Sequence, residues 1–174
     1  MQKYYRAVMD RMLRFTTRAV WLVMAVPPLA MTAQWYLARC RPATTPTVWA
    51  ITGVTLFMAA IAFFTRGLAP RGFALNDIEL VIDRALRPIR IPLSSVTEVR
   101  RVADAEMKGT LRTMGASGFY AHYGWFWNRA LGKFRLYACR FDALVLVRAG
   151  TAVFVLGPED PDSFEADVRA LTRR

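Results

Sequence analysis

Two long stretches without a charged residue occupy the first third of the chain. The first covers residues 19–38 and the second residues 42–65, with arginine on both sides of each stretch. About twenty helical residues span roughly 30 Å, which is the thickness of the hydrocarbon core of a bilayer. The pattern therefore predicts two transmembrane helices, at about 19–38 and 46–65, that form a hairpin over residues 19–65.

Other interpretations of the two stretches remain open. Helices in the core of a soluble protein usually have shorter apolar runs, of about 10–14 residues. A cleaved signal peptide needs a small-x-small site after its apolar run, and none closes the first stretch. The tetrad Leu37-Ala38-Arg39-Cys40 resembles a lipoprotein signal, but Arg39 stands where a small residue belongs. We therefore favour the hairpin.

Lysine and arginine residues flank the two stretches unequally. Five precede the first stretch, and they are Lys3, Arg6, Arg11, Arg14 and Arg18. The turn between the stretches and the segment after the second one hold fewer cations. The positive-inside rule therefore places both termini in the cytoplasm and the turn outside. Cys40 would then lie outside and Cys139 inside, so the two cysteines cannot form a disulfide with each other.

Residues 1–18 form a basic segment that also has apolar positions at helical spacing. The apolar residues recur at i, i+3, i+7 and i+10, and they are Tyr5, Val8, Met12 and Phe15. This pattern predicts an amphipathic helix that lies against anionic lipid headgroups. The cations are explained equally well as flanking charge that only sets the topology.

Composition agrees with a division of the chain into two parts. The chain has 174 residues, of which 55% are hydrophobic, and a net charge of +11, whereas soluble domains are about 45–50% apolar. Residues 1–67 carry eight Lys and Arg and one acidic residue, while residues 68–174 carry 16 and 12. The second part is only mildly basic, so we expect no nucleic-acid partner.

The hydrophobic pattern changes after Leu68 to short β-rich runs that are separated by turn residues. It predicts seven strands, at 72–75, 78–83, 88–91, 96–102, 133–140, 143–148 and 152–156. A helix follows, with Asp160 as N-cap, Pro161 in its first turn, and Phe164 and Val168 on its buried side. The order predicts an α+β, mainly β fold, in which a helix closes one end of a small barrel or sandwich.

Several segments of residues 68–174 are similar to a known family. They are Gly118–Phe126, Leu131–Ala138, Val155–Phe164 and Ile91–Val96. They resemble the bacterial pleckstrin-homology-like (PH-like) domains of small membrane proteins. The resemblance implies a cytoplasmic PH-like domain, a seven-stranded barrel capped by the C-terminal helix, behind two spans of the bacterial inner (cytoplasmic) membrane. It implies no enzymatic activity.

The segment 103–132 between the predicted fourth and fifth strands is rich in glycine and aromatic residues. Loops of this length are uncommon unless they are functional. Its rings are candidates for contact with a partner or a lipid, and they are Phe119, Tyr120, Tyr123, Trp125, Phe126 and Trp127. Aromatic side chains provide large contact areas with polar edges. The alternative is that the segment packs as an extra wall of the barrel with its rings inward.

Arg84, Arg87 and Arg90 cluster in one predicted hairpin and are candidates for contact with anionic lipid. Ordinary solvated charge at a sheet edge is the competing interpretation. Specific phosphoinositide binding is disfavoured, because the connection between the first two strands, residues 76–79, is short and acidic.

Catalysis has no support in the sequence. His122 is the only histidine, and no catalytic triad, metal-binding spacing or phosphate-binding loop is present. We therefore expect a non-enzymatic membrane-anchored PH-like domain without cofactor or metal, acting as a protein-interaction or assembly module. Its partner would be an unidentified protein or a second copy of the chain. The alternatives are a domain that binds anionic headgroups and, more weakly, a small-ligand pocket at the open barrel end.

Overall fold

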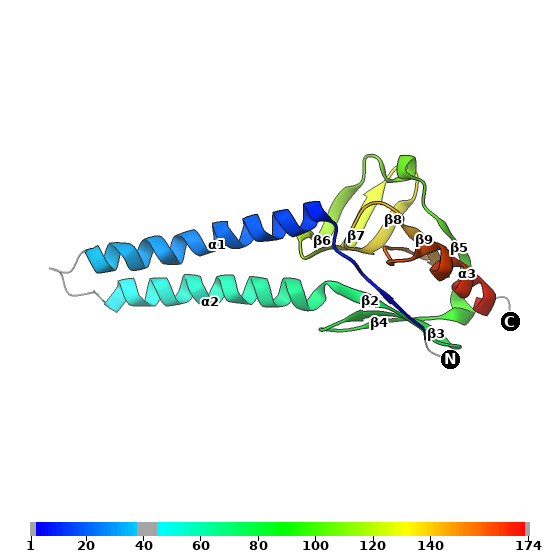
Figure 1. Cartoon of the computed structure of the whole chain (residues 1–174), viewed down its shortest axis with the longest axis horizontal. Coiled ribbons are helices and arrows are strands. Elements are labelled where there is room, and N and C mark those ends of the chain that lie inside the picture. Colours follow the sequence, from blue (N-terminus) through cyan, green and yellow to red (C-terminus); the bar gives the residue numbers. More distant parts are fainter. Residues whose placement is uncertain (1–2, 38–44, 173–174) are drawn as a thin grey trace.

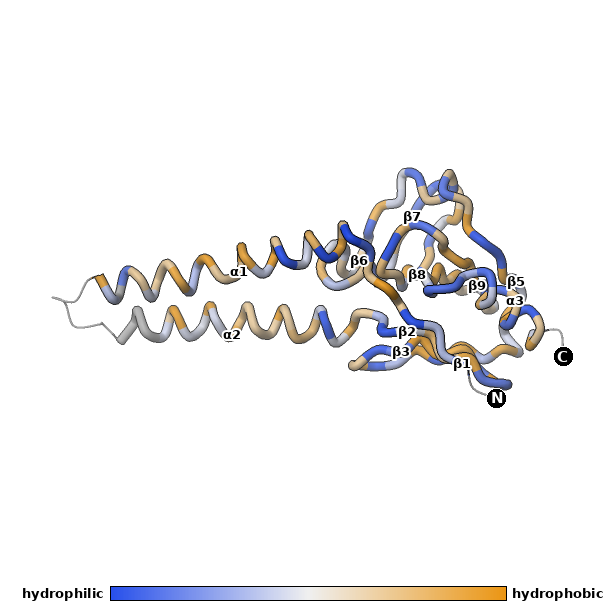
Figure 2. Tube along the Cα trace, in the orientation of Figure 1, coloured by the Kyte–Doolittle hydropathy of each residue, from blue (hydrophilic) through white to orange (hydrophobic). Residues whose placement is uncertain are grey.

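The computed structural model describes residues 3–37 and 45–172 (Figure 1). Two long helices, α1 (Arg11–Leu37) and α2 (Thr45–Leu68), run antiparallel and project from one side of a β-rich domain. Both are longer than the predicted spans, because each continues into the domain. Figure 2 shows hydrophobic residues along both helices and hydrophilic residues where α1 meets the domain.

The two helices leave most of their apolar surface uncovered by the rest of the chain. In the described part of the chain, one helical segment, Trp49–Leu68 in α2, is long and apolar enough to cross a membrane, and 11% of its apolar window is buried. On α1, Leu22 and Val23 are also mostly exposed. A core helix of a soluble protein would be mostly buried, so this exposure points weakly to a membrane. One of the two predicted spans is thereby identified as a candidate.

The domain contains two sheets and a C-terminal helix. The four-stranded antiparallel sheet has the order β1 (Lys3–Arg6), β2 (Pro70–Leu75), β3 (Glu79–Arg84), β4 (Ile89–Pro92). The six-stranded sheet has the order β5 (Val96–Arg101), β9 (Val145–Ala149), β10 (Ala152–Leu156), β8 (Gly132–Ala138), β7 (Ala121–Asn128), β6 (Leu111–Phe119). Among the strands of the described residues, β8 and β10 form the one parallel pair. Helix α3 spans Pro161–Thr172.

The two sheets do not close into the seven-stranded barrel that the sequence analysis predicts. A short 3-10 turn, η1 (Leu93–Ser95), carries the chain from β4 into the second sheet. Strands β5 and β6 are edges of that sheet, so the ladder stays open at both ends. The prediction of an α+β, mainly β domain with a C-terminal helix is correct, whereas the closed barrel is wrong.

Residues on the six-stranded sheet alternate between two hydrophobic cores. Tyr137 and Val147 belong to a core that also includes residues of the other sheet and of α3. Leu136 and Leu146, their chain neighbours, belong to a second core on the opposite face. The period of two along a strand produces this division. Because the sheet is buried on both faces, its edges and loops hold most of its exposed groups.

The N-terminal segment is not the amphipathic helix that its spacing predicts. Residues Lys3–Arg6 form β1, which pairs with β2, and α1 begins at Arg11. Tyr5 packs edge-on against Phe164, with 5.1 Å between ring centroids, and its hydroxyl donates to Asp167. These contacts with α3 favour a strand over a helix. Asp10 caps the start of α1, since its Oδ1 accepts from the Leu13 amide at 2.6 Å.

The segment 103–132 is not an irregular loop. It contains a short 3-10 turn, η2 (Asp104–Met107), and the long β6–β7 hairpin.

Two predictions about local structure in other segments are confirmed by side-chain hydrogen bonds. Asp160 caps α3, because its Oδ1 accepts from the Ser163 amide at 3.1 Å. Asn76 begins the predicted connection between the first two predicted strands, and its Oδ1 accepts from the amide of Glu79 at 2.7 Å.

Candidate interaction site at the helix-proximal end of the domain

The tip of the β6–β7 hairpin is bound to α1. Its tip residue, Tyr120, has a positive φ of 63° and turns its backbone amide toward α1. The amide donates to Thr17 Oγ1 at 3.1 Å. The Tyr120 hydroxyl accepts from Trp21 Nε1 at 2.9 Å. Two hydrogen bonds one helical turn apart therefore fix the tip of the hairpin to α1.

Helix α2 joins the same contact. The Arg66 guanidinium lies over the Tyr120 ring, with 5.5 Å between Cζ and the ring centroid. Phe119 lies against Tyr120 with the two rings tilted and their centroids 4.5 Å apart, and it meets Trp21 edge-on at 6.2 Å. Cation–π and aromatic contacts of this kind each contribute about 0.5–1.5 kcal/mol. The two helices and the hairpin thus form one packed joint.

The β3–β4 hairpin lies against the end of α2. The Leu86 amide donates to the Gly67 carbonyl at 2.7 Å. A Cβ on Gly67 would lie 2.4 Å from Leu86 Cδ1, so the absence of a side chain there permits the close approach. This hairpin carries Arg84, whose Nε donates to the Arg87 carbonyl at 2.9 Å. Two of the three predicted arginines are therefore brought to the helix-proximal end.

Six arginines lie on the segments where the helices meet the domain, and we call them the arginine collar. They are Arg14 and Arg18 near the start of α1, Arg66 at the end of α2, Arg71 at the start of β2, and Arg84 and Arg87 in the β3–β4 hairpin. None of the ion pairs among the described residues includes a member of this group. In contrast, arginines far from the helices, such as Arg100 and Arg148, both pair with Glu98 at 2.9 Å. The collar therefore carries cationic charge that takes part in none of the ion pairs formed between described residues.

Arg90 does not join Arg84 and Arg87. It lies farther along β4, where its Nη1 pairs with Glu79 Oε1 at 2.9 Å while the side chain remains 68% exposed. This position matches the competing interpretation of a solvated edge charge. The predicted cluster of three is thus a pair plus one separate residue.

Four of the six predicted contact rings are buried, and they are Phe119, Tyr120, Tyr123 and Phe126. Phe126 belongs to the second core, and the others belong to the first. The structure thereby places most of the aromatic segment as a wall of the domain with its rings inward. In this conformation these four rings contact the chain itself.

The two tryptophans of β7 differ from the other rings. Trp127 is 45% exposed and faces Leu111 across the hairpin. Trp125 is covered by two cations of β8: Lys133 Nζ lies 4.7 Å and Arg135 Cζ 4.3 Å from its ring centroid. Trp127 is therefore the predicted ring that is most available to a partner.

His122 and Cys139 are both buried inside the domain. His122 Nδ1 and Ser117 Oγ are 2.6 Å apart. Burial lowers the pKa of His122, and the charge of Asp10 opposes that shift. Burial raises the pKa of the Cys139 thiol to about 12, which leaves it unreactive near neutral pH. Among the described residues, no group of three or more His, Cys, Asp or Glu side chains is arranged to hold a metal ion.

Sequence reasoning missed the residues that hold the domain to the helices. Thr17 and Trp21 contact Tyr120 across about one hundred residues of chain, and no local pattern marks such a pair. Lys133 and Arg135 were missed as partners of Trp125 because a cross-strand pair depends on register. From the sequence, Arg66 is recognised only as the cation after the second apolar stretch, and its contact with Tyr120 is not predicted.

Comparison with known proteins identifies the domain. Residues 71–172, more than half of the chain, match the family model described as a bacterial PH domain. No curated protein and no solved structure matches the chain. The chain therefore belongs to the bacterial PH domain family, as its sequence motifs indicate.

Proposed function

We propose that this bacterial PH domain protein is a non-enzymatic, membrane-anchored interaction or assembly module. Helices α1 and α2 would both cross the cytoplasmic membrane and hold the domain at its cytoplasmic face. The domain would then bind a protein partner near the bilayer. Anchoring raises the local concentration of the domain, so a weak interface can suffice.

The observation that carries this proposal is the joint between exposed apolar helices and a packed domain. Side chains such as Leu29 and Phe63 are more than 60% exposed, which is unfavourable in water. The same helices hold the domain through Tyr120 and Thr17. Because α1 lies alongside α2, it would share the depth of α2 in a bilayer, which supports two spans.

The chain offers a built-in probe of this topology. It has two cysteines, and Cys139 is 2% exposed with a pKa raised to about 12 by burial. An impermeant maleimide should therefore react with Cys40 alone. We expect labelling of intact spheroplasts that produce the full chain, because the proposed orientation places residue 40 outside.

A matched control reports on the opposite side of the membrane. Ile78 is 77% exposed on the domain, so Ile78→Cys combined with Cys40→Ser moves the single reactive thiol there. This variant should react only after the membrane is permeabilised. Labelling of Ile78→Cys in intact spheroplasts would contradict the proposed anchoring.

The arginine collar favours a second candidate function, contact with anionic headgroups. Each cation near an anionic surface contributes about 1 kcal/mol of attraction. In nanodiscs that contain phosphatidylglycerol, amides of the β3–β4 hairpin should exchange hydrogen more slowly than in neutral phosphatidylcholine. The difference should shrink in the Arg18→Gln/Arg87→Gln variant and at high salt, but persist in the control Arg90→Gln. Equal exchange in both lipids would exclude this function.

A further inference from the structure

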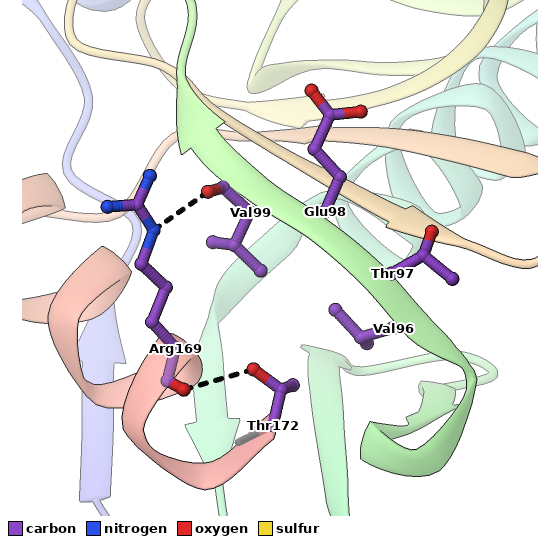
Figure 3. A pocket seen from close by; sticks show the side chains of 6 residues that line it. All are labelled: Val96, Thr97, Glu98, Val99, Arg169 and Thr172. Atoms are coloured by element: carbon purple, nitrogen blue, oxygen red, sulfur yellow. Dashed lines mark hydrogen bonds between the residues drawn. The ribbon is translucent and has the colours of Figure 1, made fainter.

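A groove lies between β5 and α3 (Figure 3). These two elements are at the end of the domain away from α1 and α2 (Figure 1). The volume of the groove is about 450 Å³. The residues that line it are Val96, Thr97, Glu98, Val99, Arg169 and Thr172. Four of these are consecutive in one strand. Since alternate side chains point to opposite faces of a sheet, a cavity lined by four in a row must lie along the edge of the strand.

That edge has no strand beside it. β5 is the outermost strand of the six-stranded sheet, and its single neighbour in the sheet is β9. The Val102 amide donates to the Leu144 carbonyl of the β9 side at 2.9 Å. In an antiparallel ladder alternate residues bond to the neighbour, so Val99 directs its backbone groups away from β9 and into the groove.

Arg169 occupies the place of a missing strand. Its Nε donates to the Val99 carbonyl at 3.0 Å, as the amide of an added strand would (Figure 3). Its Nη2 pairs with Glu165 at 2.8 Å, and the side chain is 49% exposed. The half-exposed guanidinium can therefore exchange these contacts for contacts with a ligand, although Glu165 and Val99 themselves are largely covered.

We propose that this groove binds an extended acidic peptide, which adds to β5 as a further strand. The proposal rests on the proposed function, because it names the site and the partner chemistry of an interaction module. A peptide amide would replace Arg169 Nε at the Val99 carbonyl, and the released guanidinium would pair with a peptide carboxylate. Strand addition of this kind takes affinity from main-chain hydrogen bonds and specificity from alternate side chains.

Charge at the groove favours an acidic ligand over a basic one. Glu98 is already held by two arginines, Arg100 and Arg148, each at 2.9 Å, and these contacts lower its pKa. Its negative charge is therefore compensated within the chain. Arg169 has one carboxylate partner among the described residues, Glu165, and its side chain is half-exposed. It is therefore the cation of the groove lining that a ligand carboxylate can reach and pair with.

The test uses the full chain in neutral phosphatidylcholine nanodiscs and fluorescein-labelled octapeptides. One octapeptide alternates valine with aspartate, and its counterpart alternates valine with lysine. We expect saturable binding by fluorescence anisotropy and at least a fivefold preference for the aspartate peptide. N-methylation of the amides along one edge of that peptide should weaken binding at least tenfold, because those amides can no longer donate.

Variants connect the preference to the site. Arg169→Gln should reduce the aspartate-to-lysine preference to less than twofold, while Arg90→Gln on β4 should leave it unchanged. Glu165→Gln removes the carboxylate that competes for Arg169 and should tighten binding of the aspartate peptide. This second variant keeps the test informative if Arg169→Gln unfolds.

Three results would overturn the proposal. They are no saturable binding of the aspartate peptide, equal binding of its N-methylated form, and an unchanged preference in Arg169→Gln that remains folded. Disulfide-linked dimers of Thr97→Cys, together with a dimer in sedimentation, would instead assign the edge to a second copy of the chain and also overturn it. None of these outcomes affects Cys40 labelling, so failure of the groove and failure of membrane anchoring are distinguishable.

Discussion

Substitution of Gly124 by alanine tests the register of the β6–β7 hairpin. Gly124 lies opposite Gly115, and their φ angles are 119° and 125°. A Cβ on Gly124 would lie 2.2 Å from the Met114 carbonyl oxygen and 2.8 Å from the Gly115 Cα. Both atoms belong to the backbone, so they cannot rotate away as a side chain would. Gly124→Ala must therefore separate the two strands or distort them.

The expected loss of stability has two parts that a second glycine separates. Gly118 has a φ of 89°, and a Cβ there would meet nothing within 4 Å. Gly118→Ala should therefore report backbone strain alone, about 1–2 kcal/mol. Gly124→Ala adds the overlap with backbone atoms, so its free energy of unfolding should fall by more than about 3 kcal/mol, within the range of severe single substitutions.

Thermal unfolding of the full chain in detergent, followed by tryptophan fluorescence, measures the difference. For a chain of this size, 1 kcal/mol corresponds to about 2–4 °C in Tm, so Gly124→Ala should lower Tm by roughly 6–12 °C or more. Gly53→Ala, in α2 with open space around its Cβ, should leave Tm unchanged or raise it. If Gly124→Ala costs no more than Gly118→Ala, the cross-strand glycine pair is refuted.

Three further predictions concern single contacts. Tyr120→Phe removes the acceptor for Trp21 Nε1 and should lower the free energy of unfolding by about 1 kcal/mol in denaturant titrations. Burial lowers the pKa of His122, so the unfolded chain binds its proton first, and Tm should fall as pH drops below about 6.5; His122→Gln should flatten that slope. Hydrogen bonds from Arg100 and the Ala103 amide lower the pKa of Glu106 to about 2. The ionised Glu106 side chain should therefore stabilise the folded chain above pH about 4.5, and this contribution should be lost as the pH falls toward 2. Glu106→Gln should remove this acid dependence, by about 1 kcal/mol after allowance for solvent screening.

The parts of the fold that the sequence predicts correctly are those with local signals. The Asp160 side chain, the proline after it, and Phe164 and Val168 four residues apart together specify the start and buried side of α3. Asn76 specifies its turn with its own side-chain oxygen. Each of these signals lies within a few residues of the structure it determines. Distant contacts are therefore not needed to recognise them.

The parts that the sequence mispredicts depend on contacts between distant segments. Residues 5–15 have apolar positions at a spacing that suits one helix, but Tyr5 belongs to β1 because it meets Phe164 and Asp167, contacts that form only after the chain has folded. In β6 and β7, several glycines and a row of rings resemble a loop composition. Positive φ angles at Gly115 and Gly124 instead allow a tightly paired hairpin, which buries most of those rings.

The joint at Tyr120 determines how the two candidate binding surfaces relate to each other. It holds the hairpin to α1 and α2, so the domain cannot rotate freely about the link between α2 and β2. The arginine collar lies at this end of the domain, whereas β5 and α3 lie at the opposite end (Figure 1). In the proposed orientation, contact with lipid and addition of a peptide strand would therefore not compete. A peptide in the groove would be held at a fixed distance from the bilayer, as assembly next to a membrane requires.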